Sequence, residues 1–108
     1  TDTTELVVDV SLTGIHEPTL PERYALRNNY PNPFNPGTTI GYDLPEQAKV
    51  TLRVFDIAGK RVATLVNDTR DAGSYKVKFE AGNLPSGLYI YQLETASFTA
   101  TKKMLLIN

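Results

Sequence analysis

This sequence consists of short runs in which apolar and polar residues alternate, separated by proline and glycine. The clearest run places Tyr75, Val77 and Phe79 on one face and the polar residues between Ser74 and Glu80 on the other. A period of two is typical of half-buried strands, and no stretch sustains the period of a helix. Seven prolines and seven glycines mark turns at roughly the spacing of a β-sandwich. We therefore predict an all-β, antiparallel sandwich of about seven strands.

The same alternation places the individual strands. Residues 48–66 are predicted to form a hairpin, because Asp56 to Gly59 is a favourable turn. The run from Leu88 to Glu94 is apolar on both faces, which predicts a strand in the middle of a sheet. Polar turns are expected at 67–73 and 82–87, and further strands at 24–26, 40–44, 74–80 and 98–107.

The first 22 residues differ from the rest. Residues 5–12 alternate like a strand, which is either a strand in its own right or one left over from a preceding domain. Residues 13–22 contain two prolines and a glycine and are predicted to be a linker. We therefore predict that residues 1–22 are a linker or the tail of an upstream domain, and that 23–108 form one domain. A start at Thr1, without a signal-peptide pattern, predicts a piece of a longer protein.

Charge and composition argue against several functions. Eleven basic and 12 acidic side chains give a net charge of −1, so we expect no nucleic-acid partner. No apolar run is long enough for a transmembrane helix, which needs about 18 residues. The chain has no cysteine, and its one histidine, His16, lies in the predicted linker. We therefore expect no catalytic residues, no metal ligands and no cofactor.

Weaker candidates for chemistry have simpler explanations. Asp56, Asp68 and Asp71 lie in predicted neighbouring loops and are an alternative calcium site, although turn-forming aspartates are the favoured interpretation. Ser86 is expected to be a turn serine, because no nucleophile motif surrounds it. Seven aromatic residues are either a sugar-stacking platform or, as we favour, part of the core: Tyr24, Tyr30, Phe34, Tyr42, Tyr75, Tyr89 and Tyr91.

Two further segments stand out at the ends of the predicted domain. Three prolines between Tyr30 and Gly37 fix the backbone and remove donors, which predicts a rigid loop with Tyr30 and Phe34 as anchors. Lys102 and Lys103 precede four apolar residues, Met104 to Ile107, which predicts a final edge strand guarded by lysines. An edge strand there is also a natural site for a partner strand.

Several motifs in series carry a resemblance to a known family. They are Tyr30-Pro31-Asn32-Pro33-Phe34-Asn35-Pro36, Tyr42-Asp43-Leu44-Pro45, Val54 to Val62 with Asp56 and Gly59, Leu84 to Leu93 with Gly87 and Tyr89, and Thr101 to Ile107. In this order, over about residues 24–108, they strongly resemble the C-terminal sorting domains of the type IX (Por) secretion system.

The resemblance implies a seven-stranded, Ig-like sandwich that directs a larger exported protein to the cell surface or outside. Its expected partners are the outer-membrane translocon, shuttle and sortase proteins, together with an upstream cargo domain of the same chain. The expected recognition segment is Lys102, Lys103, Met104, Leu105, Leu106 and Ile107. The other motif residues are expected to be mainly structural.

The resemblance also implies a sortase cleavage site in the linker, for which we single out Gly14, Ile15, His16 and Glu17. Two alternatives remain open at this point. The domain could instead be a carbohydrate-binding or adhesive sandwich, or an inert structural spacer of a secreted enzyme.

Overall fold

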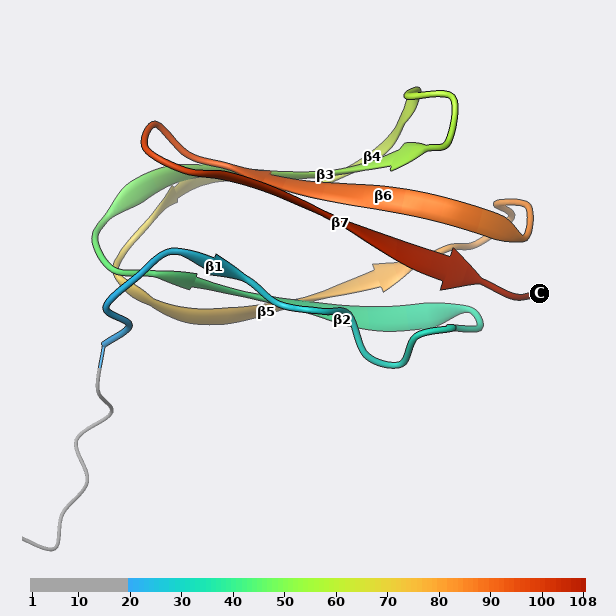
Figure 1. Ribbon diagram of the computed structural model, residues 1–108, viewed down its shortest axis with the longest axis horizontal. Coiled ribbons are helices and arrows are strands. Elements are labelled where there is room, and N and C mark those ends of the chain that lie inside the picture. The colour runs from blue at the N-terminus through green and yellow to red at the C-terminus, as the bar shows by residue number, and fades with distance from the viewer. Residues whose placement is uncertain (1–19) are drawn as a thin grey trace, which may run out of the picture.

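The computed structural model describes residues 20–108, which form seven strands and no helix (Figure 1). The predicted strand at 5–12 and most of the predicted linker lie outside the described residues. None of the described residues belongs to a helix that could cross a membrane. The strands are β1 (Ala25–Leu26), β2 (Gly37–Leu44), β3 (Ala48–Asp56), β4 (Arg61–Arg70), β5 (Gly73–Glu80), β6 (Gly87–Glu94) and β7 (Thr99–Leu106).

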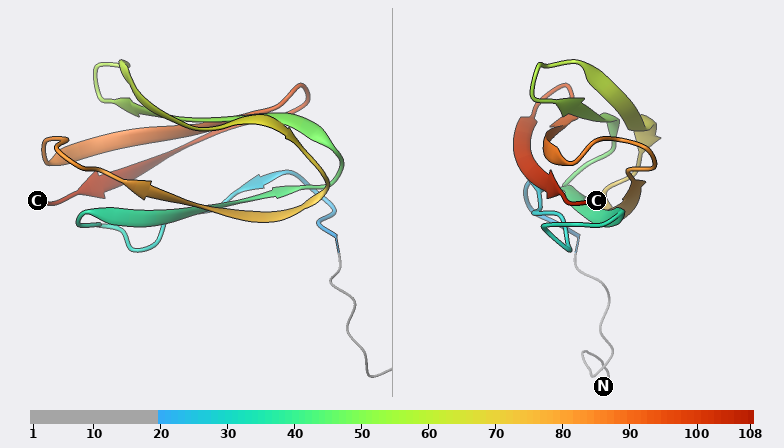
Figure 2. Two further views of the ribbon diagram at one scale, coloured as in Figure 1. Left: turned by 180° about the vertical axis from the view of Figure 1, so that it is seen from behind. Right: turned by 90° about the vertical axis from the view of Figure 1, so that its right-hand side faces the viewer.

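Two antiparallel sheets face each other and enclose the core (Figures 1 and 2). The strand order is β1-β2-β5 in the three-stranded sheet and β4-β3-β6-β7 in the four-stranded sheet. The predicted all-β sandwich of seven strands is therefore confirmed. The two-sided apolar run at β6 indeed forms an internal strand, between β3 and β7.

The predicted polar turn at 67–73 is wrong, because β4 continues to Arg70. Its last residues pair with β3, with Asp68 opposite Val50 and Arg70 opposite Ala48. These pairs satisfy the backbone with hydrogen bonds. Since β4 is the outermost strand of its sheet, Asn67 and Asp68 can stay exposed while their backbone remains in the ladder. The polar side chains of residues 67–70 therefore led the sequence analysis to end this strand too early.

The alternating apolar residues of the strands meet in one core. The most deeply buried side chains have essentially no exposed surface and come from β2, β3 and β6: Ile40, Tyr42, Leu44, Val50, Leu52, Val54, Tyr91 and Leu93. Burying such a side chain contributes about 1.5–3 kcal/mol relative to leaving it exposed. The core therefore follows directly from the period-two pattern.

Two buried tyrosines differ in how their hydroxyls are satisfied. The Tyr91 hydroxyl donates to the carbonyl oxygen of Arg27 at 2.7 Å and so links β6 to the segment after β1. The Tyr42 hydroxyl is buried without a hydrogen-bond partner among the described residues. The Tyr42 ring stacks on the Tyr75 ring, with 5.2 Å between the ring centroids. One hydroxyl therefore connects two sheets, and the other fills space.

We predict that Tyr91→Phe destabilises the domain by about 1–2 kcal/mol, because it leaves the part-buried Arg27 carbonyl without the Tyr91 donor. The matched change Tyr42→Phe should be neutral or slightly stabilising, since it removes a hydroxyl that has no partner. Urea denaturation of both variants measures the difference. Equal losses of unfolding free energy would contradict this assignment.

We also predict that stability falls in alkali. Burial raises the pKa of both Tyr42 and Tyr91, and the Arg70 guanidinium only partly opposes this at Tyr42. An unfolded tyrosine loses its proton near pH 10, so the unfolded chain ionises first. The stabilisation is therefore complete below about pH 10 and is lost as the pH rises above it. Urea denaturation from pH 8 to 11 should show this fall, and it should be smaller in the variant that carries both Tyr→Phe changes.

Candidate functional site

Four segments that are distant in the sequence lie at one end of the sandwich (Figure 1). They are the proline loop (residues 30–36), the β3–β4 turn (57–60), the β5–β6 turn (81–86) and the tail (105–108). We call this region the loop end. It contains the whole Tyr30–Pro36 motif, Gly59 and the last three residues of the expected recognition segment, Leu105 to Ile107.

Hydrogen bonds from buried Asn29 hold the proline loop from within. The Asn29 side-chain amide donates to the Pro31 carbonyl at 3.1 Å and to the Thr38 hydroxyl at 3.0 Å. The Thr38 hydroxyl donates to the same carbonyl at 2.8 Å. Tyr30 and Thr39 exchange two main-chain hydrogen bonds of 2.9 Å. The Tyr30 ring itself is 81% exposed, so only its main chain fastens the loop.

Phe34 fastens the loop to the last strand. Its ring is buried and packs edge-to-face on Phe79, with 6.0 Å between the centroids. Its N–H donates to the Leu105 carbonyl at 2.9 Å, and its carbonyl accepts from the Ile107 N–H at 3.0 Å. The Asn32 Oδ1 accepts from the Leu105 N–H at 3.0 Å. The loop thus adds a short parallel bridge to the outer edge of β7.

The tail is also tied to the β5–β6 turn. The Asn108 N–H donates to the Ser86 hydroxyl at 2.8 Å, and the Asn108 side-chain amide donates to the Leu84 carbonyl at 2.8 Å. The Ala81 N–H donates to the Pro36 carbonyl at 2.9 Å. Loop, turn and tail therefore form one hydrogen-bonded unit.

The remaining motif residues close turns at the loop end. The Asp56 Oδ1 accepts from the N–H groups of Ala58 and Lys60 at 3.0 and 2.9 Å. Gly59 has φ +86°, a conformation that side chains with a Cβ rarely adopt. The hydroxyl of buried Tyr89 donates to the Pro85 carbonyl at 2.6 Å, and Gly87 begins β6 beside it. These contacts are structural ones.

The expected recognition segment is divided between the two faces of β7. Met104 and Leu106 point inward and are buried, and Lys102 is half-buried on the same side. Lys103 and Leu105 point outward and are exposed, and Ile107, which directly follows β7, is also exposed. Half of the segment thus maintains the core, and only the other half is available to a partner.

The alternative calcium site does not form. Asp56 lies at one end of the β3–β4 pair, whereas Asp68 and Asp71 lie at the other, because ten-residue β4 runs between them. Asp68 pairs with Arg70 at 2.9 Å, and the Asp71 Oδ1 accepts from Gln47. Within residues 20–108, no group of three potential ligands comes together.

The alternative aromatic platform does not form either. Phe34, Tyr42, Tyr89 and Tyr91 are buried in the core. Tyr24 and Tyr75 are half-buried, stacked on Phe98 and Tyr42 respectively. The Tyr30 ring alone, of the seven, is fully available, so no row of rings can stack on a sugar.

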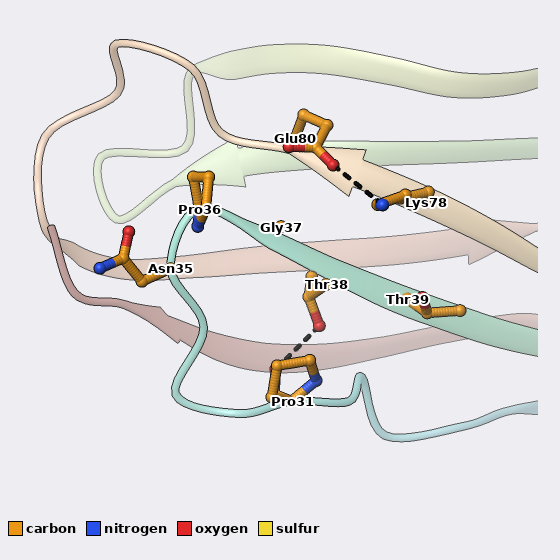
Figure 3. A pocket seen from close by; sticks show the side chains of 8 residues that line it. All are labelled: Pro31, Asn35, Pro36, Gly37, Thr38, Thr39, Lys78 and Glu80. Carbon is orange, nitrogen blue, oxygen red and sulfur yellow. Dashed lines mark hydrogen bonds and ion pairs between the residues drawn. The ribbon is translucent and has the colours of Figure 1, made fainter.

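A shallow pocket of about 340 Å³ lies beside the proline loop (Figure 3). Its charged groups, Lys78 and Glu80, pair with each other at 3.4 Å, and the Thr38 hydroxyl donates to Pro31. A Cβ at Gly37 would lie 2.7 Å from the Glu80 Oε2, so the pocket floor requires glycine or a displaced carboxylate.

Sequence reasoning missed residues outside the tail that lie near its exposed face. Leu88 and Ile90 on β6 point outward beside β7, and Phe55 on β3 lies opposite Ile90. Their signal was the two-sided apolar character of β6, which predicted an internal strand correctly. On its outer face, Leu88 is 39% exposed.

Comparison with known proteins gives one result that covers most of the chain. The model of a family described as "Secretion system C-terminal sorting domain" matches residues 28–108. The match begins just before Asn29 and includes the proline loop, both turns and the tail. No curated protein matches the chain.

We predict that Asn32→Ala loosens the tail without unfolding the domain, because it removes only the acceptor of the Leu105 N–H. Loss of one such bond should speed hydrogen exchange of the Leu105 amide about 3- to 10-fold. Asn35→Ala is the matched control, since Asn35 is exposed in the same loop. Equal exchange at Leu105 in both variants would show that Asn32 does not hold the tail.

Proposed function

This chain belongs to the family of secretion system C-terminal sorting domains, and from that premise we propose how its loop end serves sorting. The domain is a C-terminal sorting signal for type IX secretion, and such a signal implies export out of the cell or to its surface. Sorting domains of this family are not catalytic. The family match over residues 28–108 is the observation that carries this conclusion.

We propose that the outer-membrane translocon recognises the loop end by binding it, and that shuttle and sortase proteins act on the exported chain. Lys103, Leu105 and Ile107 would contact the partner, because Lys103 and Leu105 are exposed on the outward face of β7 and Ile107 is exposed directly after it. Met104 and Leu106 would contribute only through the fold, since both are buried. The proline loop would hold the tail in position through Phe34 and Asn32.

The domain itself would act by binding alone, without an enzymatic activity. We propose that residues 23–108 form the sorting domain and that 1–22 connect it to a cargo domain. A sortase would cut at Gly14 to Glu17, which lie outside the described residues. A cut there would leave the whole sandwich on the removed fragment.

The test is secretion of a reporter that carries this chain, residues 1–108, at its C-terminus in a host with type IX secretion. The variant Lys103→Glu/Leu105→Ser/Ile107→Ser should lower the secreted fraction about tenfold or more, as expected for loss of central contacts. Its melting temperature should change little, because the three side chains are exposed.

The matched control changes the outer face of the other sheet, with Lys76→Glu/Lys78→Ser, and should be secreted normally. Point variants are preferable to deleting residues 104–108, because deletion removes buried Met104 and Leu106 as well as the partners of Phe34. Normal secretion of the folded tail variant would show that the secretion machinery does not recognise the outward tail residues.

A further inference from the structure

Exposed apolar side chains lie on the strands of the four-stranded sheet, or directly after them, at the loop end. Ile57, Leu88, Leu105 and Ile107 are 73%, 39%, 38% and 50% exposed. They are four of the six large hydrophobic residues that are exposed within residues 20–108. By contrast, the outer side chains of β5 on the other sheet are serine, lysine and glutamate. Clustering of this kind marks an interaction surface more often than scattered exposure does.

The strand register places two of these side chains next to each other, and Ile57 and Ile107 directly follow β3 and β7 in the chain. Leu88 on β6 lies opposite Leu105 on β7. One row further along, Phe55 on β3 lies opposite Ile90, and both are half-buried on the outer face. Residues directly opposite in antiparallel strands share a face and touch. We call this set the outer patch, and its members are Phe55, Ile57, Leu88, Ile90, Leu105 and Ile107.

Cations border the outer patch on both sides. Arg61 on β4 lies opposite Phe55, and Lys103 on β7 lies opposite Ile90. Both are exposed, and neither forms an ion pair with another described residue. The next set of outward residues away from the loop end is polar, because Gln92 on β6 lies opposite Arg53 on β3 and Thr101 on β7. The patch is therefore bounded, with an apolar centre and a positive rim.

We propose that the outer patch docks a protein of the secretion machinery whose contact surface has an apolar centre flanked by carboxylates. This proposal rests on the sorting function and enlarges the contact from a terminal segment to a surface built from β3, β4, β6 and β7. Carboxylates would meet Arg61 and Lys103 and fix the orientation, while the apolar residues supply most of the affinity.

Charge argues against two other occupants. A second copy of the chain would bring the same cations to the interface, and the outer patch contains no carboxylate to meet them. An anionic bilayer is disfavoured because the chain has a net charge of −1 and only two cations directly flank the apolar row. An acidic protein surface therefore fits best.

The deciding variant changes the outer patch outside the tail. In the reporter with the full chain, Ile57→Ser/Leu88→Ser should lower the secreted fraction about tenfold. Arg61→Glu should lower it by a comparable factor, whereas the control Lys76→Glu on the other sheet should have no effect. Circular dichroism should show unchanged melting, since all four side chains are exposed.

Each other outcome overturns a different statement. Normal secretion of Ile57→Ser/Leu88→Ser, with loss in the tail variant, would disprove the surface and leave tail recognition intact. Normal secretion of Arg61→Glu alone would disprove the acidic partner. A purified chain that light scattering shows as a dimer, and that Ile57→Ser/Leu88→Ser makes monomeric, would assign the patch to a second copy. Sedimentation with phosphatidylglycerol vesicles that the same variant abolishes would assign it to lipid.

Discussion

The hydrogen bonds between Phe34 and the outer edge of β7 are the contact on which the loop end depends. They join a proline-rich segment near the start of the domain to its last strand. Proline has no N–H, so within Pro31–Pro36 only the residues between the prolines can donate a main-chain hydrogen bond to a strand. Phe34 makes that pairing, and its buried ring adds apolar contact to the bond. The edge of β7 is thereby covered where an exposed edge would invite association.

This pairing has a consequence for how the tail can be read. Because β7 is held in a sheet, successive side chains alternate between the core and the solvent. A partner that reads the folded domain therefore meets every second residue of the tail. It also meets side chains of β3 and β6, which the register places beside them. Folding thus makes the terminal sequence part of a surface, because alternate residues of the tail are buried in the core or exposed to solvent.

The sequence predicted the architecture well because the signal for a strand is local. Alternation, prolines and glycines placed all seven strands, and the two-sided apolar run at β6 identified an internal strand. The end of β4 was missed because its polar residues resemble a turn, and only pairing with β3 keeps them in the ladder. The alternative calcium site failed for a related reason. Asp56 and Asp68 are near in sequence, but an extended strand carries them to opposite ends of the sandwich.

By itself, the sequence determined the fold class, the lack of cysteine and the presence of a single histidine, and the family motifs. Each of these depends only on residue types and their spacing along the chain. The tertiary structure decided which motif residues meet. Asn32 binds Leu105 across 73 positions, a separation at which no local pattern carries information. It also decided which tail residues remain exposed and which neighbours from other strands surround them. Those outcomes depend on register and on sheet order, which are set by the packing of the whole chain.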